Sequence, residues 1–299
     1  MALPFLRPLA FGEILDGAFQ LYRRHFATFA VTTLIPTLAL MAGFLALGDG
    51  FVNAMTTANP EELAVDAMIG MFVIMTLGLA ASLVMWPALT RQAAQAYTGQ
   101  PTSVADGFRA SARTILPLLG AAFLAFAGMI VAAIGLVIVL MIVMLVFGAM
   151  GSAMAVVGML LVGVGYFAYL AGAAAILFAI VPAIVVEGAG PWRALERSFT
   201  LARGALGRVA GVLLVAMLIA YLPVMAVMAL TGGFAQMMDP SAVPSAGQVV
   251  AQQMLAMGVG ILTTPFLVAV IVLLYFDRRV RTEALDVQMA TDSLAVAGG

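Results

Sequence analysis

The sequence predicts an all-α integral membrane protein with six transmembrane helices. Of its 299 residues, 64% are hydrophobic and 9% are charged, whereas a soluble domain has about 45–50% apolar and about 25% charged residues. Crossing the hydrocarbon core of a bilayer takes roughly 20 apolar residues. Six uncharged windows reach that length: Phe26–Leu47, Ala67–Thr90, Ile115–Phe147, Ala153–Val186, Val209–Thr231 and Val249–Phe276.

The number of helices between Ile115 and Val186 follows from the arginines. This uncharged stretch is long enough for two long helices or three short ones, and the turn-like segment Gly148–Ser152 divides it into two. With six spans, all 13 basic residues, which are arginines, lie on one side of the membrane. The opposite loops carry only acids: Asp49, Glu61, Glu62, Asp66 and Asp239. Because basic loops stay in the cytoplasm, we expect both termini there.

Three segments before the odd-numbered spans have the pattern of amphipathic helices. They start at Phe11, Thr102 and Trp192, and their apolar residues recur at helical spacing on one face, with polar residues on the other face. Such helices lie in the membrane interface. Their 90-residue period indicates a pseudo-three-fold repeat of interfacial helix, span, outer loop and span. We therefore expect one membrane domain over residues 1–299, with repeat units at about 11–97, 102–187 and 192–277 and a cytoplasmic tail at 278–299.

Each repeat carries an acid and, seven residues later, an arginine. The pairs are Asp16 and Arg23, Asp106 and Arg113, and Glu196 and Arg203. Seven residues span roughly 10.5 Å along a helix, which is too far for a pair within one helix. One interpretation is a ring in which the acid of one repeat meets the arginine of the next. The alternative is a solvated face with local pairs such as Asp106 with Arg109.

Small residues form a stripe on the third and fourth predicted spans. Within each span the glycines recur at seven-residue spacing: Gly128 and Gly135 on the third, and Gly151, Gly158, Gly165 and Gly172 on the fourth. Small residues let helix backbones approach closely in lipid, so these two spans are predicted to form a tight hairpin. A gating hinge is the functional alternative. Each span also contains or adjoins a proline, which predicts kinks; a binding site at the broken backbone is again the alternative.

The amino-acid composition argues against a metal site, a cofactor site and a catalytic site. The chain has no Cys and one His, His25, so we expect no thiolate or histidine-rich metal site, no cofactor and no catalytic site. A net charge of -1 argues against nucleic-acid binding. The densest charged cluster is interpreted as the cytoplasmic cap of the last helix, and its residues are Asp277, Arg278, Arg279, Arg281, Glu283 and Asp286. Glu187, which is close to Arg193 in the sequence, is interpreted as a further cap or interface residue and not as a catalytic acid.

Three segments resemble a known family. They are RPLAFGEILDGAFQLYRRHFATF, VPAIVVEGAGPWRALERSFTLARGALGRVAG and LLYFDRRVRTEALD, and they resemble the membrane domain of bacterial glycerophosphoryl diester phosphodiesterases and similar uncharacterised six-span proteins. Ala284 stands where the family's closing motif would have Gly. The resemblance implies a bacterial inner-membrane domain. In some members of the family the membrane domain is fused to a soluble phosphodiesterase barrel, which needs about 250 residues. About 23 residues follow the sixth predicted span, so we do not expect phosphodiesterase activity.

Two functions fit these features. The first is a non-enzymatic membrane scaffold or anchor that binds a partner protein at the cytoplasmic face and anionic lipid headgroups through its arginines. The alternative is a permease-like or lipid-handling protein with a cavity between the hairpins, for which Thr90, Gln92 and Gln95 are candidate polar residues. A cavity at mid-membrane would favour the second function, and a close-packed interior the first.

Overall fold

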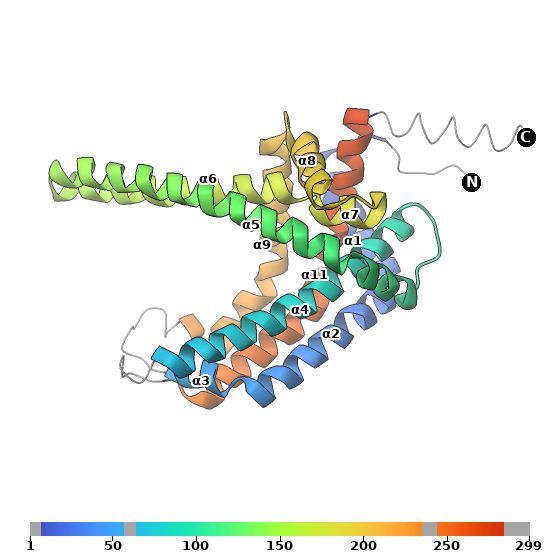
Figure 1. Ribbon diagram of the computed structural model, residues 1–299, viewed down its shortest axis with the longest axis horizontal. Helices are drawn as coiled ribbons and strands as arrows, with labels where there is room; N and C mark the ends of the chain where they lie inside the picture. The colour runs from blue at the N-terminus through green and yellow to red at the C-terminus, as the bar shows by residue number, and fades with distance from the viewer. Residues whose placement is uncertain (1–6, 57–63, 235–243, 284–299) are drawn as a thin grey trace, which may run out of the picture. The chain divides into compact units, whose positions relative to one another are not determined.

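The computed structural model describes residues 7–56, 64–234 and 244–283, and every regular element in them is a helix (Figure 1). The helices are α1 (Phe11–Arg24), α2 (Phe26–Leu47), α3 (Asp49–Thr56), α4 (Ala64–Tyr97), α5 (Val104–Ala149), α6 (Ser152–Leu177), α7 (Ile180–Glu187), α8 (Pro191–Ala202), α9 (Leu206–Leu230) and α11 (Ala246–Glu283). The predicted all-α class is therefore confirmed for this part of the chain.

Six helical segments are long and apolar enough to cross a membrane. They are Phe26–Leu47, Met68–Tyr97, Val104–Ala149, Ser152–Glu187, Leu206–Leu230 and Ala246–Glu283. Each contains or overlaps one of the predicted windows. The protein is thus a multi-pass membrane protein. Glu61, Glu62 and Asp239, and the tail beyond Glu283, lie outside the described residues.

The chain divides into two compact units that interleave along the sequence. Of the described residues, the first unit contains those within 12–115 and 215–273, and the second contains those within 7–11, 116–214 and 274–283. The boundaries between the units fall inside α1, α5, α9 and α11. The repeat itself stays a prediction.

In the first unit, α2 and α4 pack side by side (Figure 1). A Cβ on Gly43 would lie 2.9 Å from Leu77, which shows how closely the two helices approach. The end of α2 packs with α3 and α11 around a core of Phe44, Val52, Val249 and Met257. Apolar packing of this kind fixes the helices of the first unit against one another.

The second predicted amphipathic helix is not a separate element, because α5 runs without interruption from Val104 to Ala149. The first and third correspond to α1 and α8. Between α8 and α9 the chain turns at Gly204, whose φ of 76° favours glycine. The equivalent positions after Arg113 are Thr114 and Ile115, which continue a helix. α1 and α2 are separated in another way, at His25 with a φ of -113°. At Thr114 and Ile115 neither kind of turn occurs, so the predicted interfacial segment continues into the span.

In the second unit, α6 runs back along α5 (Figure 1). The turn between them is made at Gly151, with a φ of 109°. The hydroxyl of Tyr169 on α6 donates to the carbonyl of Met129 on α5 at 2.8 Å. The fourth apolar segment is broken after Leu177, and α7 starts at Ile180. Ser198 of α8 occupies the break: its Oγ accepts from the Ala179 N–H at 3.0 Å and donates to the Ile176 carbonyl at 2.6 Å.

Candidate functional site

Charged side chains at helix ends of the second unit form two ion-pair networks. The first network surrounds Asp277, whose side chain is 0% exposed. Its carboxylate accepts from the Leu9 N–H at 2.8 Å, from Arg281 Nε at 3.0 and 3.1 Å, and from Arg208 Nη2 at 3.3 Å. Asp277 therefore joins the N-terminal segment to α9 and α11.

The same two arginines also hold the backbone of the N-terminal segment. Arg281 Nη2 donates to the Leu9 carbonyl at 2.7 Å, and Arg208 Nη2 donates to that carbonyl as well. Both polar backbone groups of Leu9 are thus bonded, although this residue belongs to no helix. Because buried backbone groups need partners, this clamp makes it possible to bury Leu9, which is 3% exposed.

Arg278 satisfies the end of another helix. Its Nε donates to the Leu201 carbonyl at 2.7 Å, and its Nη2 donates to the Arg203 carbonyl at 3.4 Å. These carbonyls belong to the last turn of α8 and the residue that ends it, where no helical N–H is left to bond them. A cation here also complements the negative end of the helix dipole. Arg278 therefore fixes α8 to α11.

The second network is built around Arg197 of α8. Its guanidinium donates to both oxygens of Glu187, at 2.8 and 2.9 Å, and to both oxygens of Glu283, at 2.9 Å for Oε2. Paired donation of this kind is the geometry that arginine offers to carboxylates. These hydrogen bonds raise the pKa of Arg197 above its usual range, those to Glu187 first and those to Glu283 second, against the opposing effect of burial. Arg197 therefore links the ends of α7 and α11.

Two further side chains complete this network. Arg279 Nε lies 3.1 Å from Glu283 Oε2 and 3.5 Å from Glu187 Oε1. The Tyr275 hydroxyl donates to Glu187 Oε1, and the Arg279 guanidinium lies 5.7 Å from the centre of the Tyr275 ring. Two arginines thus face two glutamates, so the charges of the network balance.

The predicted cap cluster is brought together as two groups. Glu187, Arg279 and Glu283 belong to the second network, and Asp277 and Arg281 to the first. Glu187 pairs with Arg197, whereas the nearby Arg193 is exposed. The left-handed turn at Gly188, with φ of 67°, ends α7 before α8 begins. Further participants that the predicted cap cluster did not include are Tyr275, Arg197 and Arg208.

The acids and arginines of the expected ring make local contacts. Asp106 pairs with Arg109 at 2.7 Å. Glu196 accepts from the indole N–H of Trp192 at 2.6 Å. Arg23 lies over the ring of Phe19 at 5.9 Å. Asp16, Arg113 and Arg203 have exposed side chains. Pairing between repeats stays a prediction.

The predicted packing glycines fall into two groups. A Cβ on Gly158 would lie 2.9 Å from Phe147, and a Cβ on Gly165 would lie 3.1 Å from Leu140, so these two lie close to α5. At the other four, a Cβ would meet nothing within 4 Å: Gly128, Gly135, Gly151 and Gly172. Close approach of α5 and α6 thus uses only part of the stripe.

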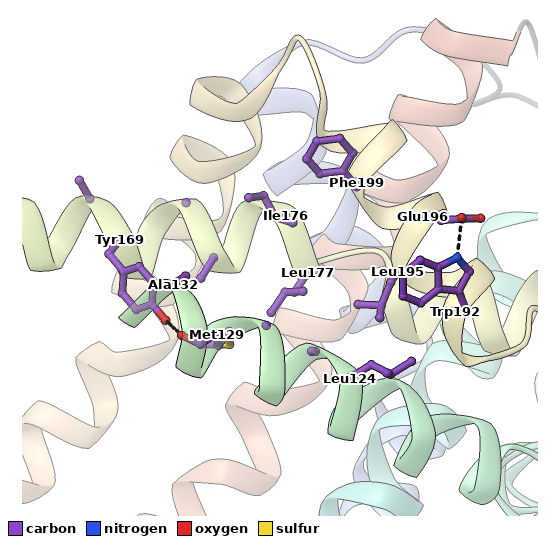
Figure 2. A pocket seen from close by; sticks show the side chains of 15 residues that line it. Leu124, Met129, Ala132, Tyr169, Ile176, Leu177, Trp192, Leu195, Glu196 and Phe199 are labelled. Carbon is purple, nitrogen blue, oxygen red and sulfur yellow. Dashed lines mark hydrogen bonds between the residues drawn. The ribbon is translucent and has the colours of Figure 1, made fainter. Parts of the chain in front are cut away.

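Two of the open glycines line a groove between α5, α6 and α8 (Figure 2). Its volume is about 600 Å³. The lining is almost entirely apolar, and its members are Leu124, Ala125, Gly128, Met129, Ala132, Ala168, Tyr169, Gly172, Ala173, Ile176, Leu177, Trp192, Leu195, Glu196 and Phe199. The volume falls in the range of small-molecule sites, roughly 300–1,000 Å³.

The polar candidates on α4 are buried in the first unit. Thr90, Gln92 and Gln95 are 1%, 0% and 8% exposed. Gln92 Nε2 donates to Thr32 Oγ1 of α2 at 2.7 Å and to the Ser103 carbonyl at 3.3 Å. Gln92 therefore ties α2 and α4 to the segment that precedes α5.

Comparison with family models, with curated proteins and with solved structures finds no match to this chain. Within the described residues, no group of three or more His, Cys, Asp or Glu side chains could hold a metal ion.

Proposed function

We propose that this protein is a non-enzymatic scaffold or anchor in a bacterial cytoplasmic membrane, holding a partner protein at the cytoplasmic face. The observation that carries the proposal is the pair of ion-pair networks around Asp277 and Arg197. Together they fix the N-terminal segment, α7, α8, the start of α9 and the end of α11 to one another. Docking of a partner needs such a rigid surface, because flexible charged ends lose conformational entropy on binding.

A structural role accounts for the carboxylates of the networks. Glu187 and Glu283 both bond Arg197, and Asp277 bonds two arginines and a backbone N–H. A catalytic acid or base needs a proton that it can exchange with a substrate in a cleft. Carboxylates whose oxygens already accept several hydrogen bonds from arginines are better suited to holding helices together.

The finer topology is part of the proposal: three hairpins, each preceded by an interfacial helix, with both termini in the cytoplasm. It is supported by α1 and α8, which each bury one side. Ile14 and Ala18 of α1 and Ala194 and Ser198 of α8 are buried, while Trp192 is exposed. This is the pattern of a helix that rests on a membrane surface.

The proposed sidedness can be tested directly, because the chain contains no cysteine. We expect Asp49→Cys and Met150→Cys to react with a membrane-impermeant thiol reagent from the periplasmic side of intact cells. Thr282→Cys should react only after the cells are permeabilised. The reverse labelling pattern would overturn the topology.

Exposed arginines are the proposed contact residues for the partner and for anionic lipid headgroups. In the second unit, Arg193 and Arg203 are two of the exposed arginines. A basic residue near an anionic membrane surface contributes about 1 kcal/mol to membrane association. The permease-like or lipid-handling alternative takes second place, because it needs a cavity between the hairpins, whereas the groove described above is lined by α5 and α6 of one hairpin and by α8.

The docking function is tested by chemical cross-linking and affinity purification from native membranes. We expect the wild-type protein to retain a specific partner and the double variant Arg193→Glu/Arg203→Glu to lose it. The control Ser152→Glu adds a negative charge at the start of α6, which is the end of that helix farther from α7 along the chain. This variant should retain the partner. The proposal fails if charge reversal leaves the recovered proteins unchanged, or if an unrelated six-span protein recovers the same set.

A further inference from the structure

The groove between α5, α6 and α8 has a definite architecture (Figure 2). On one side, α5 and α6 are joined by the hydrogen bond from Tyr169 to Met129. Near the start of α8, a Cβ on Gly120 would lie 2.8 Å from Pro191, so α5 and α8 are in close contact there. Three helices therefore enclose the groove, and its residues on α5, from Leu124 to Ala132, extend over roughly 12 Å of helix.

The surroundings of the groove indicate that it faces the hydrocarbon chains of the membrane. Large apolar side chains on both helices are exposed, among them Phe123 and Phe126 of α5 and Met159 and Leu160 of α6. The segments that carry them are long enough to cross a membrane. A groove that opens between such surfaces contacts lipid chains and not water.

One end of the groove is different. Trp192 and Glu196, one turn apart on α8, lie together there (Figure 2). Glu196 is the only charged side chain among the described residues of the lining. Its Oε1 accepts from the Trp192 indole, and its Oε2 has no partner in the part of the chain that the structure describes. Tryptophan at a helix end is typical of the headgroup level of a membrane.

We propose that this groove binds one phospholipid with a primary ammonium headgroup. An acyl chain lies along α5 and α6, and the ammonium donates a hydrogen bond to Glu196. The fit in length follows because one leaflet of a roughly 30 Å hydrocarbon core gives a chain of about 15 Å. The second oxygen of the Glu196 carboxylate can accept a strong, charge-assisted hydrogen bond from a cationic donor. The exposed Arg193, next to Trp192 in the sequence, supplies a positive charge for the phosphate.

A helix from a second protein fits less well. A helix about 10 Å wide occupies about 420 Å³ per 5.4 Å turn. The groove of about 600 Å³ would hold less than two turns, which is too little for a stable helix contact. A flexible acyl chain fills a narrow space without that limit. This inference does not depend on the proposed docking function, because the lipid would bind whether or not a partner protein does.

The test uses the full-length protein, purified in detergent, stripped of lipid and then mixed with one phospholipid at a time. Native mass spectrometry measures the bound fraction of phosphatidylethanolamine, phosphatidylcholine and phosphatidylglycerol with identical acyl chains. We expect phosphatidylethanolamine to bind about tenfold more tightly than the other two, since a hydrogen bond to a charged group contributes about 1.5 kcal/mol or more. In Glu196→Gln that preference should disappear.

Groove-filling variants test the acyl-chain site separately. Gly172→Leu and Gly128→Leu place a side chain into open space on different helices, so both should fold and bind all three lipids about tenfold more weakly. The matched control is Gly163→Leu, which also has open space but lies outside the lining; it should bind like the wild type. Equal lipid binding by Gly172→Leu, Gly128→Leu and Gly163→Leu would overturn the site. A preference for phosphatidylglycerol would overturn the headgroup assignment, and a dimer that Gly172→Leu dissociates would show that a second copy fills the groove.

Discussion

The substitution Asp277→Asn isolates the contribution of one buried charge to stability. Asparagine has nearly the same shape and can still accept the hydrogen bond from the Leu9 N–H. It removes the negative charge that faces Arg208 and Arg281, which contact the carboxylate at 3.3 and 3.0 Å. The variant therefore leaves two arginines with a neutral partner, while the helix packing around it is kept.

The expected cost follows from the burial of the three side chains. Removal of one partner from a fully buried ion pair costs about 3–5 kcal/mol. Asp277 is 0% exposed, but Arg208 and Arg281 are 29% and 32% exposed. Water recovers part of the loss at the arginines, so we expect the free energy of unfolding to fall by about 2–3 kcal/mol.

Thermal unfolding in detergent measures this loss. A fall of about 2–3 kcal/mol should lower the Tm by about 5 °C or more. The matched control is Asp106→Asn, because Asp106 and Arg109 form an ion pair with 42% and 69% exposed side chains. Exposed pairs of this spacing contribute about 0.5 kcal/mol or less, so the Tm of this control should hardly change.

Hydrogen exchange gives a second measure of the same change. In Asp277→Asn, the peptide that contains Leu9 should exchange faster, because the segment is held through Asp277 and its two arginines. If Asp277→Asn lowers the Tm no more than Asp106→Asn and leaves this exchange unchanged, the reasoning about the first network is refuted.

Three further predictions concern single side chains. Arg197→Lys should lower the free energy of unfolding by about 2 kcal/mol, because lysine cannot bond two carboxylates in pairs; equal unfolding curves for Arg197→Lys and the exposed control Arg193→Lys would contradict this. The pKa of His25 is lowered below 6.5, first by burial and second by the positive charge of Arg24. The unfolded state therefore binds more protons than the folded state, and the free energy of unfolding should fall as the pH drops below 6.5. NMR titration of this sole histidine should give a midpoint below 6.5, and the pH dependence should disappear in His25→Gln; a midpoint above that value would contradict the prediction. Gly188→Ala should cost about 1 kcal/mol in thermal unfolding because Gly188 has a φ of 67°; the control Gly190→Ala, at a φ of -71°, should cost much less, and equal losses would rule out the backbone explanation.

Hydropathy predicted the spans well, because crossing lipid places a demand on local composition. The window Phe26–Leu47 coincides with α2, and the other five windows overlap the remaining long apolar segments. The interfacial segment before the third span was harder to predict. α5 is continuous there, whereas the chain turns at Gly204 between α8 and α9 and at His25, with a φ of -113°, between α1 and α2.

The break between α6 and α7 combines a local signal with a contact from another helix. Pro182, at the start of α7, has no N–H to donate to the Phe178 carbonyl four residues earlier, so the kink predicted from the proline in this span has a local cause, but the side chain that fills the break could not be predicted. Ser198, on another helix, bonds the Ala179 N–H and the Ile176 carbonyl. A side chain distant in the sequence thus replaces helical hydrogen bonds.

The candidate sites divide in the same way. Charge patterning identified five residues of the two networks, but their partners Arg197 and Arg208 come from other segments. The glycine stripe predicted tight packing, which holds at Gly158 and Gly165, whereas Gly172 opens into the groove. A heptad spacing fixes which residues share a helix face, but it does not fix which neighbour covers that face.

By itself, the amino-acid sequence determined the helical class, the apolar spans and the side of the helices on which small residues lie. These are local properties, since the composition of about 20 neighbouring residues decides whether a segment can enter lipid. Only the tertiary structure decided which arginine meets which carboxylate, which side chain bonds the broken end of a span and where a groove remains. Those outcomes depend on contacts between segments far apart in the chain, because a charge or an orphan backbone group is satisfied by whichever partner the fold brings within hydrogen-bond distance.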